Sequence, residues 1–152
     1  IQTSAGPGGG VSLFFGTGRY FTADDNAVTR NSPVQTLYGI WDNLSDAISS
    51  RDVLVGQSIS ANGAAFRDIS SNAVDYSTKR GWYVDLIVDT TVEGERFFGY
   101  PTLQGGTVMF TTYVPGQSVC GTGGGVNWRY RLNMATGQPA MTGPFSRPGS
   151  MG

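Results

Sequence analysis

The chain has 152 residues, 39% of them hydrophobic, which is enough to form the core of one domain of ordinary size. Its 23 glycines, 12% aromatic residues and 14% charged residues are typical of an all-β protein with many turns. The net charge is −1 and the longest basic run is Lys79-Arg80, which argues against a nucleic-acid partner. The sequence contains no histidine that could act as a general base, and it contains no stretch of about eighteen apolar residues that could span a membrane.

The first third of the chain is predicted to hold two paired strands. Residues 1–10, rich in glycine, read as a flexible N-terminal segment without the basic and apolar regions of a signal peptide. The first strand covers residues 11–15, and the second covers residues 36–41. Between them lies a polar stretch of residue types that cap and turn, so we expect a long exposed loop.

A helical turn and a hairpin are predicted next. Ser50 is placed to N-cap one turn over residues 51–54. Asn62-Gly63 is the strongest two-residue hairpin signal in the sequence, because both residues accept the positive φ of a type I′ turn. The hairpin would join strands at residues 54–60 and 64–69.

Four further stretches are predicted to be strands. Residues 80–88 and 126–132 alternate, which places Trp82, Val84 and Leu86 on one face of the first and Trp128, Tyr130 and Leu132 on one face of the second. Residues 96–103 read as an edge or bent strand because they contain Gly99 and Pro101, and residues 107–114 are rich in β-branched and aromatic types. Residues 142–152 are predicted to be a flexible C-terminal segment.

These short strands at hairpin spacing, with no helix long enough for a crossover, favour antiparallel four-stranded blades of a β-propeller. A two-sheet β-sandwich is the alternative fold. At about 40 to 50 residues per blade, residues 11–141 hold two to three blades. A closed propeller needs at least about four, so the blades would dock on the rest of a larger propeller polypeptide.

Six blocks of sequence follow one another along the chain: FGTGRYF (15–21), QTLYGIWDN (35–43), RGWYVDL (80–86), GER (94–96), PTLQGGTVMFTT (101–112) and CGTGGGVNWRYRLNMATG (120–137). In this order they resemble the C-terminal propeller region of the PilY1/PilC family of type IV pilus tip proteins. The resemblance covers most of the chain, from residue 13 to residue 137. Several aromatic and glycine motifs in a fixed order are far more specific than any one of them.

The resemblance implies a non-enzymatic part of a tip adhesin that also supports pilus biogenesis, extension and retraction, and twitching motility. The implied location is extracellular, at the pilus tip or bacterial cell surface, after export through the periplasm. The implied partners are the rest of the propeller polypeptide, the minor pilins of the tip, and a host-cell or abiotic surface. Rigid blades would expose contact loops, for which residues 22–33, 70–79 and 115–125 are candidates.

One cluster of oxygen-bearing side chains is a candidate metal site. Asp24, Asp25 and Asn26 offer ligands that suit a hard cation such as calcium. Calcium binding occurs in the family that the chain resembles. The alternating D-x-D-x-D loop associated with it is not found in these residues, and a solvated turn or a strand cap is the favoured alternative. No other cofactor is predicted.

No catalytic site is predicted. Cys120 lacks a second cysteine and an activating histidine, so it is either a free thiol or the disulfide partner of a segment outside these 152 residues. The glycine-rich stretches at residues 16–18 and 121–125 lack the pattern of a dinucleotide fold or a P-loop. Proximity in a loop does not make a catalytic pair of Asp42, Asp46 and Asp52, or of Glu93 and Glu95.

Two other functional classes stay open. A quinone-dependent dehydrogenase-like propeller enzyme also ends its repeats in a turn like Thr136-Gly137, but the chain lacks a second cysteine, a histidine and an evident set of metal ligands. A carbohydrate-binding β-sandwich module would show a flat row of exposed aromatic side chains. Most aromatic residues here are expected in the core, because they lie in strand-like runs.

Overall fold

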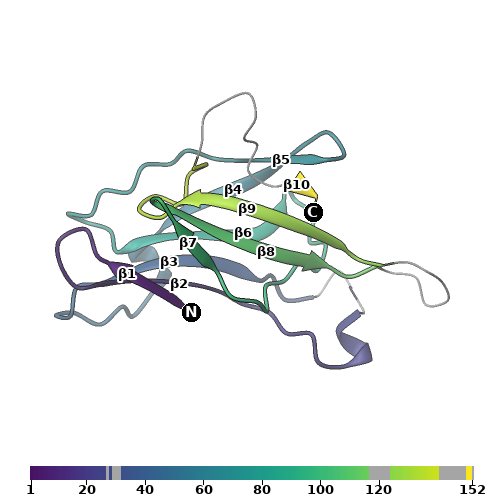
Figure 1. Ribbon diagram of the computed structural model, residues 1–152, viewed down its shortest axis with the longest axis horizontal. Helices are drawn as coiled ribbons and strands as arrows, with labels where there is room; N and C mark the ends of the chain where they lie inside the picture. Colours follow the sequence, from purple (N-terminus) through teal and green to yellow (C-terminus); the bar gives the residue numbers. More distant parts are fainter. Residues whose placement is uncertain (27, 29–31, 117–123, 141–149, 152) are drawn as a thin grey trace.

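The computed structural model describes residues 1–26, 28, 32–116, 124–140 and 150–151. These residues confirm an all-β protein (Figure 1). The strands are β1 (Gln2–Ala5), β2 (Val11–Gly16), β3 (Thr36–Asp42), β4 (Val55–Asn62), β5 (Phe66–Ile69), β6 (Gly81–Val88), β7 (Thr102–Gln104), β8 (Thr107–Val114), β9 (Val126–Asn133) and β10 (Ser150–Met151). Two short 3-10 turns, η1 (Ala23–Asn26) and η2 (Arg51–Val53), interrupt the loops. No helix in this described part of the chain is both long enough and apolar enough to cross a membrane.

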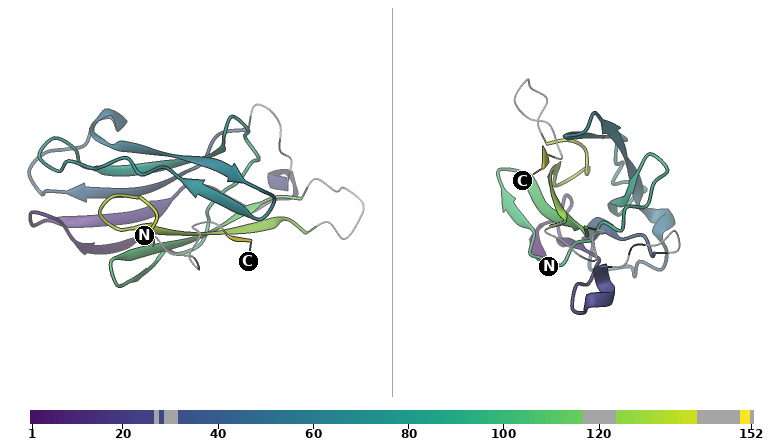
Figure 2. Two further views of the ribbon diagram at one scale, coloured as in Figure 1. Left: turned by 90° about the horizontal axis from the view of Figure 1, so that it is seen from above. Right: turned by 90° about the vertical axis from the view of Figure 1, so that its right-hand side faces the viewer.

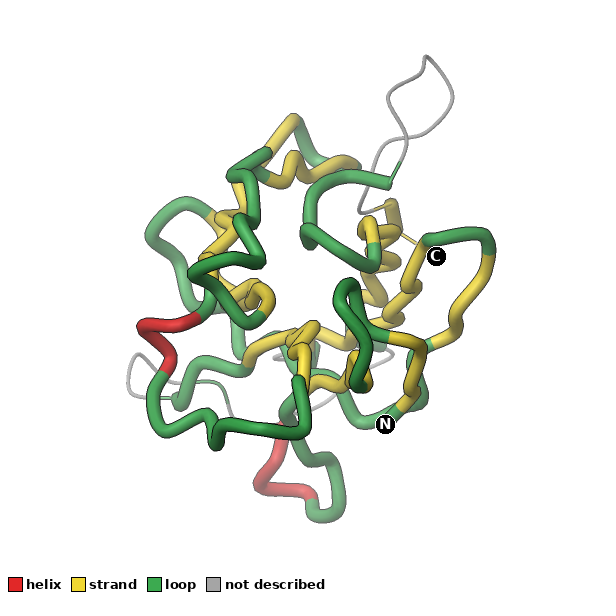
Figure 3. Tube along the Cα trace, turned by 90° about the vertical axis from the view of Figure 1, so that its left-hand side faces the viewer, coloured by secondary structure: helices red, strands yellow, loops and turns green. Residues whose placement is uncertain are grey.

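The strands form one hydrogen-bonded order, β1-β2-β3-β6-β4-β5-β10-β9-β8-β7. The strands β1, β2, β3, β6, β4 and β5 curl like half a barrel, and β7, β8 and β9 form a second part on the other side of the core (Figure 2). Viewed from the end, the strands surround a common centre (Figure 3). The two-residue strand β10 joins the parts, since it pairs with both β5 and β9.

Separate four-stranded blades are not seen among the described strands, and one pairing corrects the expectation of an antiparallel sheet. β4 and β6 are parallel neighbours, with Val55 opposite Trp82. The chain runs out along β4 and back along β5, and residues 70–80 then return it to the other side of β4. β6 therefore enters between β3 and β4 in the same direction as β4, without a helical crossover.

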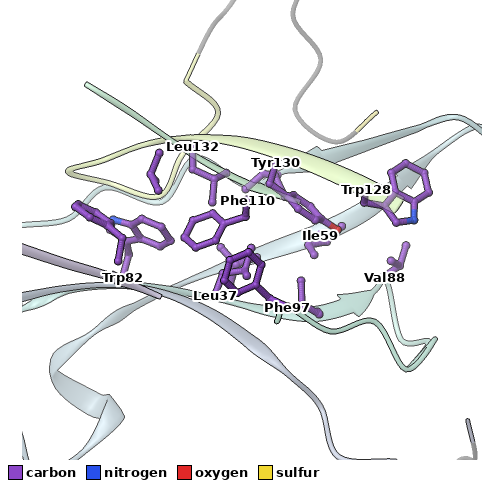
Figure 4. Close-up of a cluster of buried hydrophobic side chains, with 14 residues drawn as sticks. Leu37, Ile59, Trp82, Val88, Phe97, Phe110, Trp128, Tyr130 and Leu132 are labelled. Carbon is purple, nitrogen blue, oxygen red and sulfur yellow. The ribbon is translucent and has the colours of Figure 1, made fainter. Parts of the chain in front are cut away.

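The core lies between the two parts of the sheet and draws on both (Figure 4). The alternation predicted for β6 and β9 is confirmed, because the inward residues of both strands are buried. The cluster consists of Phe14, Leu37, Ile59, Ile69, Trp82, Val84, Leu86, Val88, Phe97, Val108, Phe110, Trp128, Tyr130 and Leu132.

The N-terminal residues differ from the predicted flexible segment. Residues 2–5 form β1, which pairs with β2 in antiparallel register. The glycine loop that follows packs on an indole ring: Trp41 Nε1 donates to the carbonyl of Gly9 at 2.7 Å. A Cβ on Gly6 would lie 2.4 Å from the same ring. These glycines thus allow close approach of the backbone, which the sequence alone does not distinguish from flexibility. Of the predicted C-terminal segment, only residues 150–151 are described, as β10.

Three other local predictions have mixed outcomes. The capped turn is confirmed, since Ser50 Oγ accepts a hydrogen bond from the backbone N–H of Asp52 at 3.1 Å. The hairpin β4–β5 is confirmed, but Asn62 pairs with Phe66, so its loop has three residues and not two. In place of the strand predicted at residues 96–103, only β7 (Thr102–Gln104) is formed. The preceding residues do not continue the strand, and Glu95 and Phe97 there are buried in the core.

Candidate functional site

The three residues predicted to bind a metal lie together on η1. The middle one, Asp25, is buried, and one of its carboxylate oxygens accepts hydrogen bonds from the backbone N–H groups of Phe21 at 2.8 Å and Thr22 at 3.0 Å. Its other oxygen accepts from Arg19 Nε at 3.1 Å. The amides of Phe21 and Thr22, followed by the charge of Arg19, lower the pKa of Asp25 to about 2. The carboxylate therefore stabilises its own turn.

The flanking residues of the cluster face different surroundings. Asn26 Oδ1 accepts a hydrogen bond from the Tyr20 hydroxyl. Asp24 is exposed and lines a shallow pocket with Arg19 and Arg96. Among the residues that the structure describes, no group of three or more His, Cys, Asp or Glu side chains could hold a metal ion. Calcium binding at the three residues of η1 stays a prediction.

An aromatic patch adjoins this turn. The rings of Tyr20 and Phe98 stack with centroids 5.8 Å apart, and the Tyr113 ring stands edge-on to Tyr20 at 5.3 Å. Phe21 and Tyr100 flank this trio in sequence and are 85% and 84% exposed. Large exposed apolar side chains are characteristic of contact surfaces. The sequence predicted a strand for Phe98 and Tyr100, but both lie in the loop before β7. Tyr20 and Phe21 lie in the predicted loop after β2, and Tyr113 lies in β8 as predicted.

A buried ionic cluster ties the two parts of the sheet together. Arg67 on β5 is 2% exposed and pairs with Glu95, also 2% exposed. Tyr130 on β9 accepts a hydrogen bond from Arg67 and donates one to Glu95 Oε1 at 2.9 Å, and the Thr112 hydroxyl donates to the same oxygen. Glu93 pairs with the second guanidinium nitrogen of Arg67 from a more exposed position. In the part of the chain that the structure describes, no buried side-chain nitrogen or oxygen lacks a hydrogen-bond partner.

Burial controls the protonation of this cluster. Desolvation raises the pKa of Glu95, opposed by the charge of Arg67, and desolvation also raises the pKa of Tyr130 well above its usual range. For Arg67, desolvation acts to lower the pKa, but Tyr130 and Glu95 raise it on balance. The guanidinium carbon also lies 3.8 Å from the centroid of the Trp128 ring. The convergence of Arg67, Glu95 and Tyr130 in the core suits a structural role.

This cluster was not predicted from the sequence. Glu93 and Glu95 are neighbours in a loop, and both converge on Arg67, which lies 26 and 28 positions earlier in the chain. One signal was present: Arg67 is in phase with Ile69 on a two-residue period, so the alternation that buries Ile69 also buries Arg67.

The other loop carboxylates do not converge. Asp42, Asp46 and Asp52 each accept a hydrogen bond from a residue close in sequence and so act as turn caps. The donors are the backbone N–H of Leu44 at 2.8 Å, the side-chain amide of Asn43 at 3.3 Å and the hydroxyl of Ser50 at 2.9 Å. Cys120 and most of the predicted contact loop at residues 115–125 lie outside the described residues.

The sequence matches no protein-family model. It is similar to the type IV pilus biogenesis factor PilY1 homologue of Xylella fastidiosa, with 42% identity over 146 residues that cover 93% of this chain and 10% of the relative. It is also similar to the type IV pilus biogenesis factor PilY1 of Pseudomonas aeruginosa strain PAO1, with 33% identity over 150 residues that cover 84% of this chain and 13% of the relative. The chain thus spans about a tenth of the length of the curated relatives that it matches.

The fold agrees with this relationship. The crystal structure of the Pseudomonas aeruginosa PilY1 C-terminal domain is similar with a TM-score of 0.76 and 27% identity, over 91% of this chain and 31% of that one. Sequence and fold therefore point to the same proteins, and they confirm the resemblance seen in the ordered sequence blocks. The chain belongs to the PilY1 family and corresponds to part of its C-terminal region.

Proposed function

We propose that this chain is a non-enzymatic segment of a type IV pilus biogenesis factor. The observation that carries the proposal is the 42% identity with a PilY1 homologue along 93% of the chain. The buried charges also support it. Arg67 and Glu95 are bound to each other and to Tyr130, and in the described residues no buried side-chain nitrogen or oxygen lacks a hydrogen-bond partner. Such a network stiffens a fold.

The segment is proposed to be part of a larger β-propeller. The chain corresponds to 31% of a solved PilY1 C-terminal domain, so most of that domain lies outside the matched part. We propose in addition that the intact propeller consists of four-stranded blades and that this chain contributes two to three of them. The rest of the same polypeptide would then complete the domain.

The site of action is proposed to be the pilus tip, outside the cell, where the whole protein would contact minor pilins and a host-cell or abiotic surface. Adhesion, extension and retraction of the pilus, and twitching motility are the proposed processes. The aromatic patch of Tyr20, Phe21, Phe98, Tyr100 and Tyr113 supports a contact role, because two of its rings are almost fully exposed. Residues 70–79 are a second candidate contact loop.

Deletion in the native setting tests this proposal. In the bacterium that encodes the chain, residues 1–152 would be removed in frame, and sheared surface pilin and the diameter of the twitching zone would be measured. We expect both to fall and to return when the intact gene is supplied. Immunogold labelling with an antibody against residues 1–152 should mark pilus tips. Normal surface pilin and normal twitching in the deletion strain would show the proposal to be wrong.

A further inference from the structure

The side of β2, β3 and β6 that faces away from the core is itself apolar. Phe14, Leu37 and Trp82 point into the core, so their neighbours in each strand point to the opposite side. This outer aromatic face consists of Leu13, Phe15, Tyr38, Ile40, Tyr83 and Ile87, all of them half-buried. Phe15 pairs in register with Tyr38, and Tyr38 with Tyr83, so the rings form a row across three adjacent strands.

The rings of this row cover one another's flat surfaces. Phe15 and Tyr38 stack with centroids 5.1 Å apart and planes 23° apart. The guanidinium carbon of Arg51 lies 3.9 Å from the Tyr83 ring centroid and is held there by an ion pair with Asp85 at 2.8 Å. A sugar needs an open ring face on which to stack, and these faces are already in contact with side chains. The aliphatic side chains of Leu13, Ile40 and Ile87 lie on the same face as the rings, and such a mixture suits a protein surface.

The composition of the outer aromatic face is that of a covered surface. An antiparallel sheet with one side in water alternates apolar and polar residues, whereas strands buried on both sides read as nearly continuous apolar runs. Residues 11–15 (VSLFF) and 82–88 (WYVDLIV) are of the second kind. Tyrosine, phenylalanine and arginine are the types enriched at the centres of interfaces. Beside the row, Gly56 and Ser58 leave a shallow groove along β4 and β6.

We propose that the outer aromatic face packs against another β-sheet of the same polypeptide. This inference rests on the proposed function, in which the chain is a segment of a longer pilus factor. The length of the similar C-terminal domain suggests which sheet covers this face. This chain covers 31% of that domain, so the domain is about three times as long as the matched part and can supply a further sheet. The partner sheet contributes an apolar side, because the face offers few charges besides the paired Arg51 and Asp85.

Site-specific photocross-linking in the full-length protein tests the inference. Tyr83→p-benzoylphenylalanine and Phe15→p-benzoylphenylalanine place a reactive ring on the face, and Tyr100→p-benzoylphenylalanine is the control away from it. After irradiation, mass spectrometry maps the linked peptides. We expect positions 83 and 15 to link within one molecule to residues outside 1–152, and to share the same target sheet, while position 100 does not reach that sheet.

Three results would overturn the inference: no cross-link from either face position, cross-links to a second copy, or cross-links to a pilin subunit. A second measurement guards against misfolding. Ile40→Glu on the face should lower the unfolding temperature of the full-length protein, whereas Thr111→Glu on the exposed side of β8 should not. Twitching of the cross-linking variants distinguishes a failure of the packing inference from a failure of the proposed function. If they twitch normally without the intramolecular link, the packing inference fails while the proposed function stands.

Discussion

Arg67 and Glu95 carry charge, yet each is only 2% exposed. Removing two ions from water is unfavourable, and their attraction compensates only when further hydrogen bonds satisfy the remaining atoms. Tyr130 and Thr112 supply those bonds from two other strands. The cluster therefore stabilises one arrangement of β5, β8 and β9 over others, because any shift in register leaves a buried charge without a partner.

Glu95→Gln should destabilise the protein by about 3–5 kcal/mol, because it leaves the buried guanidinium of Arg67 without its main counter-charge. The matched control is Glu93→Gln, which removes the more exposed partner of the same guanidinium and should change stability by about 0–1 kcal/mol. Urea unfolding followed by tryptophan fluorescence gives both values. Equal losses in the two variants would contradict a dominant role for the buried pair.

Asp25 should make the stability of the protein depend on pH in the acidic range. Its pKa falls from 3.8 to about 2 on folding, chiefly through the amides of Phe21 and Thr22. A group with a depressed folded pKa stabilises the fold above its unfolded pKa, and this contribution is lost as the pH falls through the folded value. The loss should therefore occur between pH 3.8 and about 2. NMR titration of the Asp25 carboxyl carbon should give a midpoint near the lower limit, and a midpoint at the ordinary value would show that the hydrogen bonds do not form.

Calcium binding at Asp24, Asp25 and Asn26 has a separate test. If the proposed site exists, calcium raises the unfolding temperature of the unmodified protein, and Asp24→Asn removes that rise without lowering stability in calcium-free buffer, because Asp24 is exposed. Asp25→Asn is the contrasting variant, since it lowers the unfolding temperature even without calcium through the loss of its backbone hydrogen bonds. The calcium proposal is wrong if the ion leaves the unmodified protein unchanged in differential scanning calorimetry.

At the scale of elements, the turn after β9 is fixed by its contact with β6. Trp82 lies between two glycines: a Cβ on Gly39 would come within 2.3 Å of the indole, and one on Gly137 within 2.5 Å. Trp82 Nε1 also donates to the carbonyl of Met134 in the same turn at 2.9 Å. The turn thus closes one end of the core, which explains why a residue with no side chain ends it.

Gly137→Ala should destabilise the protein more than Gly63→Ala. Both glycines have a positive φ, 68° and 69°, so the backbone strain of the substitution is the same. A methyl group at position 63 meets nothing within 4 Å, but one at position 137 overlaps Trp82. The difference should therefore be about 1–3 kcal/mol, the usual cost of overpacking. Thermal unfolding of the two variants measures it, and an equal effect would rule out the packing explanation.

The local sequence pattern predicted most strands correctly, but it predicted only some of the pairings between strands. The two-residue period of β6 and β9 identified Trp82, Val84, Tyr130 and Leu132 as core residues, because burial follows directly from alternation. The parallel pairing of β4 with β6 depends on contacts between residues far apart in the chain, and no local signal encodes it. The same holds for the site: the turn at Asp25 was visible as capping chemistry, whereas Arg67 and Glu95 meet only in the folded chain.

At the scale of the whole molecule, the two parts of the sheet meet at a seam between β5 and β9. Backbone pairing across it comes from β10, with one residue pair to β5 and two to β9. Side chains cross the same seam, because Arg67 on β5 donates to the Tyr130 hydroxyl on β9. The core also spans it, with Ile69 and Trp128 in one cluster. Most of the binding energy between the parts therefore comes from side chains and not from β10.

A chain that ends at Ala140 should consequently still fold and unfold in one cooperative transition. Losing the three residue pairs of β10 should cost about 1–2 kcal/mol at the usual value of a cross-strand pair, which is less than the loss expected for Glu95→Gln. Hydrogen exchange should then show β6 protected in the truncated chain as in the full one, because β6 stays paired with both β3 and β4 and keeps its hydrogen bond to Met134. Two separate unfolding transitions would instead mean that β10, and not the ionic cluster and the core, holds the two parts together.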